Sequence, residues 1–297
     1  MVLRPRPGAA QRLNVFRAAA WMLLGIFALS AVAVAGREVS SDLDTFELML
    51  YRSLLGIPVV WALARWRGEG LRTARLPLHF LRNVFHFTAQ NLWFYALALI
   101  PLAQVFALEF TTPIWVVLLA PLALRERLTR TGLIAVALGF VGILVVVRPG
   151  IVPLELAHGA TLLSALGFAG TVLSTKLLSG TENTYRVLFY MTLMQAGLAL
   201  LCAAPGGIAL PVAANLPWIA VLGLCGIGAH FCITQALRLA PANVVSPLDF
   251  VRLPLIAVVG MVLYGEPLEW AVFAGGALIV AGNLLNIRSQ RGENSPQ

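Results

Sequence analysis

Ionisable side chains interrupt two of the most apolar stretches of the chain. Glu109 lies within the segment FALEFTTPIWVV at residues 106–117, and a later stretch carries Asp249 with Arg252 three positions on. A charged group in apolar surroundings is costly unless it is paired or faces a cavity, so each of these residues needs a partner. A carboxylate could hold an ammonium group or a proton there, and a guanidinium could hold a carboxylate.

Structural roles are the simplest alternatives for these three residues. Glu109 could hydrogen-bond to a neighbouring helix without touching a ligand. Asp249 and Arg252 would lie on one face of a helix, where they could form an ion pair that offsets part of the cost of burying each charge. Residue types alone leave both interpretations open: contact with a substrate or proton, and a purely structural pair.

Two further segments carry polar side chains at helical spacing. Asn83, His86 and Gln90 follow one another at intervals of three and four, and His230 and Thr234 are one turn apart. A single buried histidine is usually just hydrogen-bonded. A polar face on two otherwise apolar helices instead predicts that both helices line a cavity.

Aromatic and hydroxyl side chains complete the candidate site. Trp93 and Trp115 could line a cavity because aromatic faces offer large contact area and attract cations, although packing is the commoner role of tryptophan. On a continuous helix Thr112 would share the face of Glu109. The predicted substrate-binding residues are Asn83, His86, Gln90, Trp93, Glu109, Thr112, Trp115, His230, Thr234, Asp249 and Arg252.

The elements that position these residues are predicted to be transmembrane helices. Of the 297 residues 59% are hydrophobic and 11% are charged, against about 25% charged in ordinary soluble domains. The apolar runs of roughly 18 to 24 residues suit helices that cross a hydrocarbon core of ~30 Å. We predict an all-α polytopic membrane protein with ten transmembrane helices, centred near Leu24, Leu55, Asn91, Val116, Gly139, Gly167, Leu193, Gly226, Ala257 and Leu278.

The ten predicted helices form two repeats. With an offset of 140 residues, ALALIPLAQVFALEF at 96 aligns with ALRLAPANVVSPLDF at 236, which matches Glu109 with Asp249. Five helices per repeat is an odd number, so the second repeat must enter the membrane from the opposite side. We therefore predict two inverted five-helix domains, residues 1–150 and 151–297, an architecture that secondary transporters use for alternating access.

Basic residues predict the orientation of the chain. They gather beside alternate predicted loops, near residues 4–17, 65–82, 125–130, 176–186, 238 and 288–291, whereas the opposite side has Arg37 and Arg148. By the positive-inside rule both termini face the cytoplasm, in the cytoplasmic (inner) membrane. The net charge of +8 then reflects topology and not a nucleic-acid partner. Arg82 is counted with the loop bases, and Arg52, inside the second predicted helix near Glu47, is interpreted as snorkelling or paired.

Carboxylates also recur beside two predicted turns. Glu126 and Glu266 match in the repeat alignment and precede the last helix of each half. A carboxylate in the first turn of a helix is stabilised by the exposed amides there, so we expect each to cap the helix that follows. A role in gating the two mouths of the transport path is the alternative.

The last predicted helix of each half has small residues in place of polar ones. Gly139 and Gly142 lie in the first of these helices, and Gly275 and Gly282 lie in the second. Small residues allow helix backbones to approach closely. We expect the two helices to form a packing seam between the halves, or a dimer face.

These motifs resemble a known family. LIPLAQV and LAPANV precede the predicted fourth and ninth helices, RERLT and GEPLE follow them, and GLIAVALGFVGILVVV and AVFAGGALIVAGNLLN end the halves. With these features the chain resembles the ten-helix EamA-type family of the drug/metabolite transporter superfamily over nearly all of residues 13–288. The resemblance implies export of amino acids, drugs or other metabolites, although a few members of the family import. The second copy departs from the first where Thr112 is matched by Arg252.

We therefore expect a secondary transporter that exports small metabolites, with amino acids as the leading substrates, by alternating access. The alternative is a proton-coupled exporter of organic cations or drugs; a receptor or scaffold would need neither matched acids nor an inverted repeat. We expect no enzymatic activity and no cofactor or metal, since Cys202, Cys225 and Cys232 lack metal-site spacing. The expected partners are a small-molecule substrate and the lipid bilayer, with a monomer and a homodimer both left open.

Overall fold

The structure is a computed structural model that describes residues 9–124, 130–150, 153–239 and 246–293. Every element of regular secondary structure in those ranges is a helix. Glu126, for which capping or gating is predicted, lies outside the described residues. The main helices are α1 (Ala9–Val39), α2 (Thr45–Trp66), α3 (Leu76–Leu99), α4 (Leu102–Glu109), α5 (Thr112–Leu124), α6 (Arg130–Val147), α7 (Leu156–Ser179), α8 (Thr184–Ala203), α9 (Leu216–Leu239), α11 (Arg252–Tyr264) and α12 (Trp270–Glu293), with a 3₁₀-helix η3 (Ser246–Val251) before α11.

Apolar length identifies the membrane-crossing segments. Within the described ranges, seven segments are long and apolar enough to span a bilayer, and two shorter apolar helices cover Arg252–Tyr264 and Trp270–Leu285. Helix α3 is 24 residues long but is absent from the seven, which is consistent with its polar face. The chain therefore has the all-helical, multi-span character that its composition predicts.

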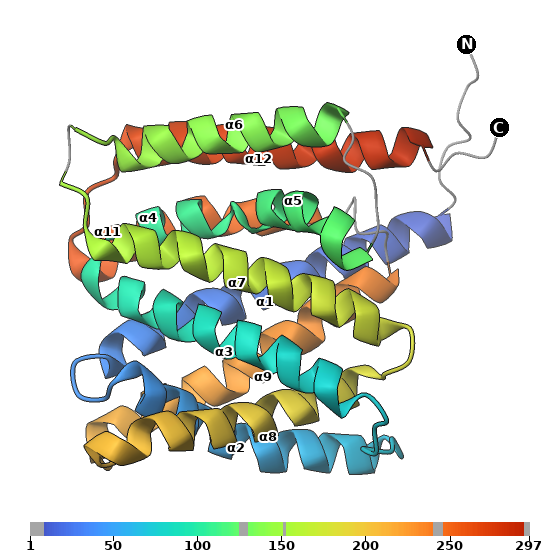
Figure 1. The fold of residues 1–297 in the computed structure, drawn as a ribbon, viewed down its shortest axis with the longest axis vertical. Helices are drawn as coiled ribbons and strands as arrows, with labels where there is room; N and C mark the ends of the chain where they lie inside the picture. The colour runs from blue at the N-terminus through green and yellow to red at the C-terminus, as the bar shows by residue number, and fades with distance from the viewer. Residues whose placement is uncertain (1–8, 125–129, 151–152, 240–245, 294–297) are drawn as a thin grey trace.

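The helices run roughly side by side across the molecule (Figure 1). Helices α6 and α12 pack together at one edge, α2 and α8 pack together at the opposite edge, and α1–α9 and α3–α7 contacts join the layers between them. We call the end where α1 begins and α12 ends the first end, and the end where α1 ends and α12 begins the second end. The loops α2–α3 and α7–α8 lie together at the first end (Figure 1).

Close backbone contact joins α6 to α12. A Cβ atom added to Gly142 would lie 2.7 Å from the carbonyl oxygen of Gly275, and one added to Gly275 would lie 2.6 Å from that of Gly142. A Cβ atom at Gly282 would lie 2.7 Å from the carbonyl oxygen of Ala135. Such distances exclude any side chain, so the predicted packing seam between these two helices is confirmed.

The predicted fourth helix is broken, which corrects the expectation of one continuous helix carrying both Glu109 and Thr112. Helix α4 ends at Glu109 and α5 begins at Thr112. Pro113 has no amide hydrogen to donate to the Glu109 carbonyl, and the Thr112 hydroxyl donates to that carbonyl instead at 2.7 Å. Asn283 of α12 donates to the Phe110 carbonyl at 3.1 Å. Side chains thus satisfy the backbone groups freed at the break, as burial in a membrane requires.

The second half has a similar irregularity at the matching place. The 3₁₀-helix η3 contains Asp249, and α11 starts at Arg252 with Pro254 in its first turn. Proline is tolerated there because the first amides of a helix have no intrahelical acceptor. Both irregular segments therefore carry ionisable residues at the point where helix geometry changes.

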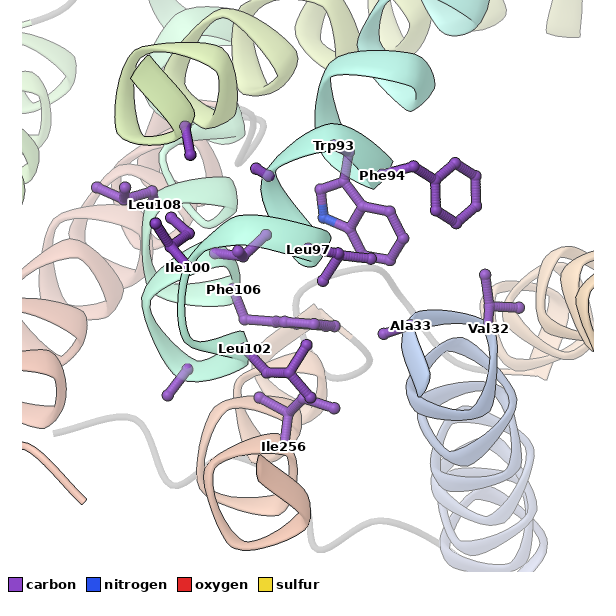
Figure 2. Close-up of a cluster of buried hydrophobic side chains, with 14 of the residues drawn as sticks. Val32, Ala33, Trp93, Phe94, Leu97, Ile100, Leu102, Phe106, Leu108 and Ile256 are labelled. Atoms are coloured by element: carbon purple, nitrogen blue, oxygen red, sulfur yellow. The ribbon is translucent and has the colours of Figure 1, made fainter. Parts of the chain in front are cut away.

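The main apolar core fixes α4 against its neighbours. Phe94, Leu97, Leu102 and Phe106 are fully buried. Figure 2 shows the ring of Phe106 between Leu97 and Leu102, directed toward Ala33 of α1. Burying these side chains contributes roughly 1.5–3 kcal/mol each, which holds the short helix α4 and its terminal Glu109 in place.

Candidate functional site

An ion cluster connects the two irregular segments. Nη2 of Arg252 lies 3.0 Å from Oε1 of Glu109 and 3.4 Å from Oδ2 of Asp249. The side chains of Arg252 and Glu109 are 6% and 15% exposed, so this contact is largely shielded from solvent. One guanidinium at the start of α11 therefore bridges the end of α4 and η3.

Aromatic side chains surround the cluster. Trp93 of α3 donates its indole N–H to Oε2 of Glu109 at 2.9 Å. The guanidinium carbon of Arg252 lies 4.9 Å from the ring centroid of Phe106 and 5.3 Å from that of Phe110. Each ring face attracts the cation, and both shield it from water. The cluster is thus held from α3, α4 and α11.

The cluster retains unused hydrogen-bonding capacity. Among the described residues, Oδ1 of Asp249 and Nε of Arg252 are buried without a hydrogen-bond partner. One guanidinium faces two carboxylates, so the three groups carry a formal charge of −1 when all are ionised. A buried polar atom without a partner is destabilising by about 1–3 kcal/mol, and its presence in a native structure calls for an explanation such as strain, a functional role, or a bound water or ion.

Four predicted site residues therefore meet: Trp93, Glu109, Asp249 and Arg252. The ion pair predicted between Asp249 and Arg252 is present, but the contact from Arg252 to Glu109 is shorter. The sequence did not reveal that a single guanidinium serves both acids, because the repeat offset matches their positions without showing that their side chains meet.

Thr112 and Trp115 have contacts of another kind. The Thr112 hydroxyl donates a hydrogen bond to the Glu109 carbonyl. The Trp115 ring packs edge-on against the Phe140 ring of α6, with 5.9 Å between the ring centroids. The indole nitrogen of Trp115 is buried without a partner among the described residues. Their contribution to substrate binding stays a prediction.

The polar faces predicted on two helices meet each other. Asn83, His86 and Gln90 are buried on α3, and the His86 ring lies 6.2 Å from the ring of His230 on α9. Asn83 donates to the carbonyl of Tyr190 on α8 at 3.3 Å. Neither ring nitrogen of His86 has a hydrogen-bond partner among the described residues.

Two cavities meet at His230. The smaller lies between α2, α8 and α9; its other lining residues are Arg52, Ser53, Met191, Thr192, Gly223, Gly226 and Ile227. The larger reaches the α7–α8 loop at the first end; its other lining residues are Arg82, Thr175, Ser179, Glu182, Thr184, Val187, Leu188 and Thr234. His230 and Thr234 thus line cavities as predicted, whereas the ion cluster lines neither of these two.

Two arginines were misassigned from sequence. Arg82, counted as a loop base, is a buried residue of α3 whose Nε lies 3.0 Å from the Thr175 hydroxyl. Arg52, interpreted as snorkelling or paired, is buried and hydrogen-bonds the neutral side chain of Gln195 at 2.9 Å. The spacing of four between Arg82 and His86 could have placed Arg82 on the polar face, but its position near the predicted end of the helix favoured the loop.

A polar network closes the second end. Oε2 of Glu266 accepts the backbone N–H of Leu102 at 2.9 Å, and its other oxygen pairs with Arg37. Arg148 pairs with Glu269. Nε2 of the Gln104 side chain donates to Oε1 of Glu269 at 3.4 Å. The prediction that Glu266 caps the helix after it is corrected, because it caps the start of α4 instead. The carboxylate thereby links α1, α4 and the segment before α12.

At the first end, Glu182 links two loops. It accepts hydrogen bonds from the Thr73 hydroxyl at 2.6 Å and from Nη1 of Arg186 at 2.8 Å. Partial burial acts to raise the pKa of Glu182, but these bonds and the nearby charges outweigh burial and lower the pKa below its usual range. Glu182 also lines the larger cavity.

Comparison with known proteins identifies the family. Residues 16–148 and 156–288 each match the EamA-like transporter family, and the chain belongs to that family. A solved crystal structure has the same fold, with a TM-score of 0.63 and 20% identity over 94% of this chain and 99% of that chain. The chain is therefore a membrane transporter with two EamA domains.

Curated relatives cover nearly the whole chain. A riboflavin transporter of Rhizobium johnstonii is 29% identical over 94% of this chain and 93% of its own length. An S-adenosylmethionine uptake transporter of Rickettsia bellii is 23% identical, with coverage of 91% and 93%. A pseudopaline exporter of Pseudomonas aeruginosa is 26% identical, with coverage of 91% and 95%. These relatives are transporters of different small molecules.

Proposed function

We propose that this chain is a secondary transporter that exports small zwitterionic metabolites, with amino acids as the leading class, across the cytoplasmic membrane. The observation that carries the proposal is the position of Arg252 between Glu109 and Asp249 at two irregular helix segments. In secondary transporters, discontinuous helices near the bilayer midplane typically form the substrate site. The proposal treats the cluster as that site.

A zwitterion matches the cluster group by group. Its carboxylate would take the place of Glu109 on the guanidinium of Arg252, and its ammonium group would bind Glu109 and the unpartnered Oδ1 of Asp249. Separating the buried pair without replacing both partners would leave an uncompensated charge, which is destabilising by about 3–5 kcal/mol. A solute that carries both charges avoids that cost, so the cluster selects for zwitterions.

Alternating access by two inverted halves, residues 1–150 and 151–297, is the proposed mechanism. Contacts between helices support this mechanism. In the repeat alignment α1 corresponds to α7 and α3 corresponds to α9, and the helix contacts occur in corresponding pairs. The contact of α1 with α9 then corresponds to that of α7 with α3, and α2–α8 and α6–α12 each join equivalent helices. Such exchange symmetry is expected of two similar halves related by a two-fold axis.

The proposed substrate class rests on the chemistry of the cluster, and the proposed direction rests on the family resemblance. The relatives named above are described as a riboflavin transporter, an S-adenosylmethionine uptake transporter and a pseudopaline exporter. They support transport of small molecules, and their names include both uptake and export. Export is proposed from the predicted family resemblance, with both termini in the cytoplasm.

Proton-coupled export of organic cations is the second candidate. It is favoured by the formal charge of −1 on Glu109, Asp249 and Arg252, which one cation or one proton would neutralise. In this mechanism the cargo and a proton would bind the acidic pair in turn. Arg252 would keep one carboxylate partner throughout.

Flux measurements in proteoliposomes separate the two candidates. The purified protein would be reconstituted, and counterflow of a panel of zwitterionic amino acids would be compared with that of tetraphenylphosphonium, a permanent cation, from pH 5 to pH 8. Amino-acid counterflow without tetraphenylphosphonium flux supports the first candidate. Tetraphenylphosphonium flux that requires a proton gradient supports the second, and flux of neither class contradicts both.

A further inference from the structure

Two buried arginines lack the carboxylate partners that a buried cation ordinarily has. Arg52 on α2 is 9% exposed and Arg82 on α3 is 4% exposed. Across the described part of the chain, no carboxylate forms an ion pair with either guanidinium, whereas the equally buried Arg252 has two. Burial of an uncompensated charge is strongly destabilising, so this arrangement calls for a counter-charge from elsewhere.

Neutral groups hold both arginines in place. Nη2 of Arg52 donates to Oε1 of Gln195 at 2.9 Å. Nε of Arg82 donates to the Thr175 hydroxyl at 3.0 Å, and Nη1 donates to Oδ1 of Asn83 at 3.2 Å. These bonds fix the orientation of the guanidinium groups but leave their charge uncompensated.

Arg52 lines the smaller and Arg82 the larger of the two cavities that meet at His230. Nearby groups add donor capacity: Nε2 of Gln195, the hydroxyl of Ser53 and the one N–H of the neutral His86 ring are buried without partners among the described residues. Glu182 is the carboxylate among the lining residues, and it is already bound by Arg186. The surroundings of these two cavities therefore have an excess of positive charge and of hydrogen-bond donors.

We infer that the cavities around Arg52 and Arg82 form a binding site for an oxyanion, the carboxylate or phosphate group of the transported solute. The planar guanidinium group suits such groups because its N–H donors match two oxygens at once. The inference rests on the proposed transport function, and it assigns to this pocket the first recognition of the anionic part of the cargo.

Helix α3 connects this oxyanion site to the ion cluster. Arg82, His86, Gln90 and Trp93 follow one another at spacings of four, four and three, so they share one face of the helix. Eleven residues at ~1.5 Å each extend over about 16 Å, from Arg82 to the indole that contacts Glu109. A solute carboxylate could thus pass from the pocket to Arg252 along a polar helix face.

Anion binding to the purified protein tests the site without any flux measurement. Inorganic phosphate and succinate serve as probes, and thermal unfolding is followed at constant ionic strength with chloride as the replacement salt. We expect saturable stabilisation of the parent by at least one probe. Arg52→Gln and Arg82→Gln should each weaken binding about tenfold or more, the equivalent of one lost charge-assisted hydrogen bond. Arg65→Gln, an exposed change on α2, should bind like the parent.

The same variants give a second readout in the absence of probe. Removal of an uncompensated buried charge should leave the melting temperature of Arg52→Gln unchanged or higher, whereas a purely structural arginine would make it lower. If a glutamine variant does not fold, Arg52→Lys and Arg82→Lys keep the charge and lose the planar fork, and each should bind phosphate several-fold more weakly. Parent-like affinity in both arginine variants, or no saturable effect on the parent, overturns the site.

Flux separates failure of this site from failure of the proposed function. Parent-like amino-acid flux and anion binding in Arg52→Gln and Arg82→Gln would refute the oxyanion site and leave transport through the ion cluster standing. Phosphate binding that needs both arginines, in a protein that moves no solute, would support the site and refute the proposed function. Loss of amino-acid flux and of anion binding in Arg52→Gln and Arg82→Gln, with both retained in Arg65→Gln, supports the oxyanion site and the proposed function together.

Discussion

Arg252 at the start of α11 lies 3.0 Å from Glu109 at the end of α4, a contact between residues 143 positions apart. It joins the two segments in which regular helix geometry is interrupted. The contact therefore connects the two parts of the chain that each match the EamA family. Any movement of one half relative to the other must either carry this pair along or separate it.

The strength of this pair can be measured by a double-mutant cycle. We expect Glu109→Gln and Arg252→Gln each to lower the free energy of unfolding, by about 1–3 kcal/mol for Glu109→Gln because Arg252 keeps Asp249. The double variant should lose less than the sum, with a coupling energy of about 0.5–3 kcal/mol. Asp249→Asn is the matched comparison and should cost less, since its contact is longer. Additive effects in the cycle would show that the two side chains are independent.

The break between α4 and α5 should depend on the side chains that satisfy its carbonyls. Asn283→Leu removes the donor to the Phe110 carbonyl, and Thr112→Val removes the donor to the Glu109 carbonyl. Each should lower the free energy of unfolding by about 1–3 kcal/mol. Thr171→Val is the matched control, because its hydroxyl donates to the Gly167 carbonyl inside the continuous helix α7. An equal effect of all three substitutions would refute a special role for the break.

The fold and the site differ in how far the sequence determined them. Composition and apolar length were enough for the helical membrane class, and the offset that matches Glu109 with Asp249 located both acids of the cluster. The helix break was not predicted, because Pro113 is compatible both with a kink inside one continuous transmembrane helix and with the start of a new helix. The buried position of Arg82 was also missed, since an arginine near a helix end is usually solvated and only tertiary packing against Thr175 buries it.

Acid sensitivity is expected at the first end of the bundle. The pKa of Glu182 is lowered in the folded protein by its bonds to Thr73 and Arg186, despite partial burial. Its contribution to stability is thus complete above its unfolded pKa of about 4.3 and is lost as the pH falls through the lower folded value. Glu182→Gln should flatten the decrease in melting temperature between about pH 5 and pH 3. Thr73→Val should shift the decrease to higher pH; curves identical to the parent would contradict this role.

The orientation of the chain in the membrane can be tested by cysteine labelling. In a variant with Cys202, Cys225 and Cys232 replaced by serine, single cysteines at Gly70 and Leu210 probe the exposed loops at the two ends. If the first end faces the cytoplasm, an impermeant thiol reagent outside intact cells should label the cysteine at Leu210. The cysteine at Gly70 should react only after permeabilisation. The reverse pattern would invert every inside and outside assignment.

Amino-acid counterflow by Glu109→Gln in proteoliposomes tests the central claim most directly. The substitution keeps the shape of the side chain and removes the charge that would bind the ammonium group, while folding is checked by the melting temperature of the same preparation. We predict that counterflow falls at least about tenfold, the cost of one charge-assisted hydrogen bond, in protein that is still folded at the assay temperature. Trp66→Phe, an exposed aromatic change at the end of α2, should transport like the parent. Undiminished counterflow in folded Glu109→Gln would contradict the account, because the ion cluster could then not be the substrate site.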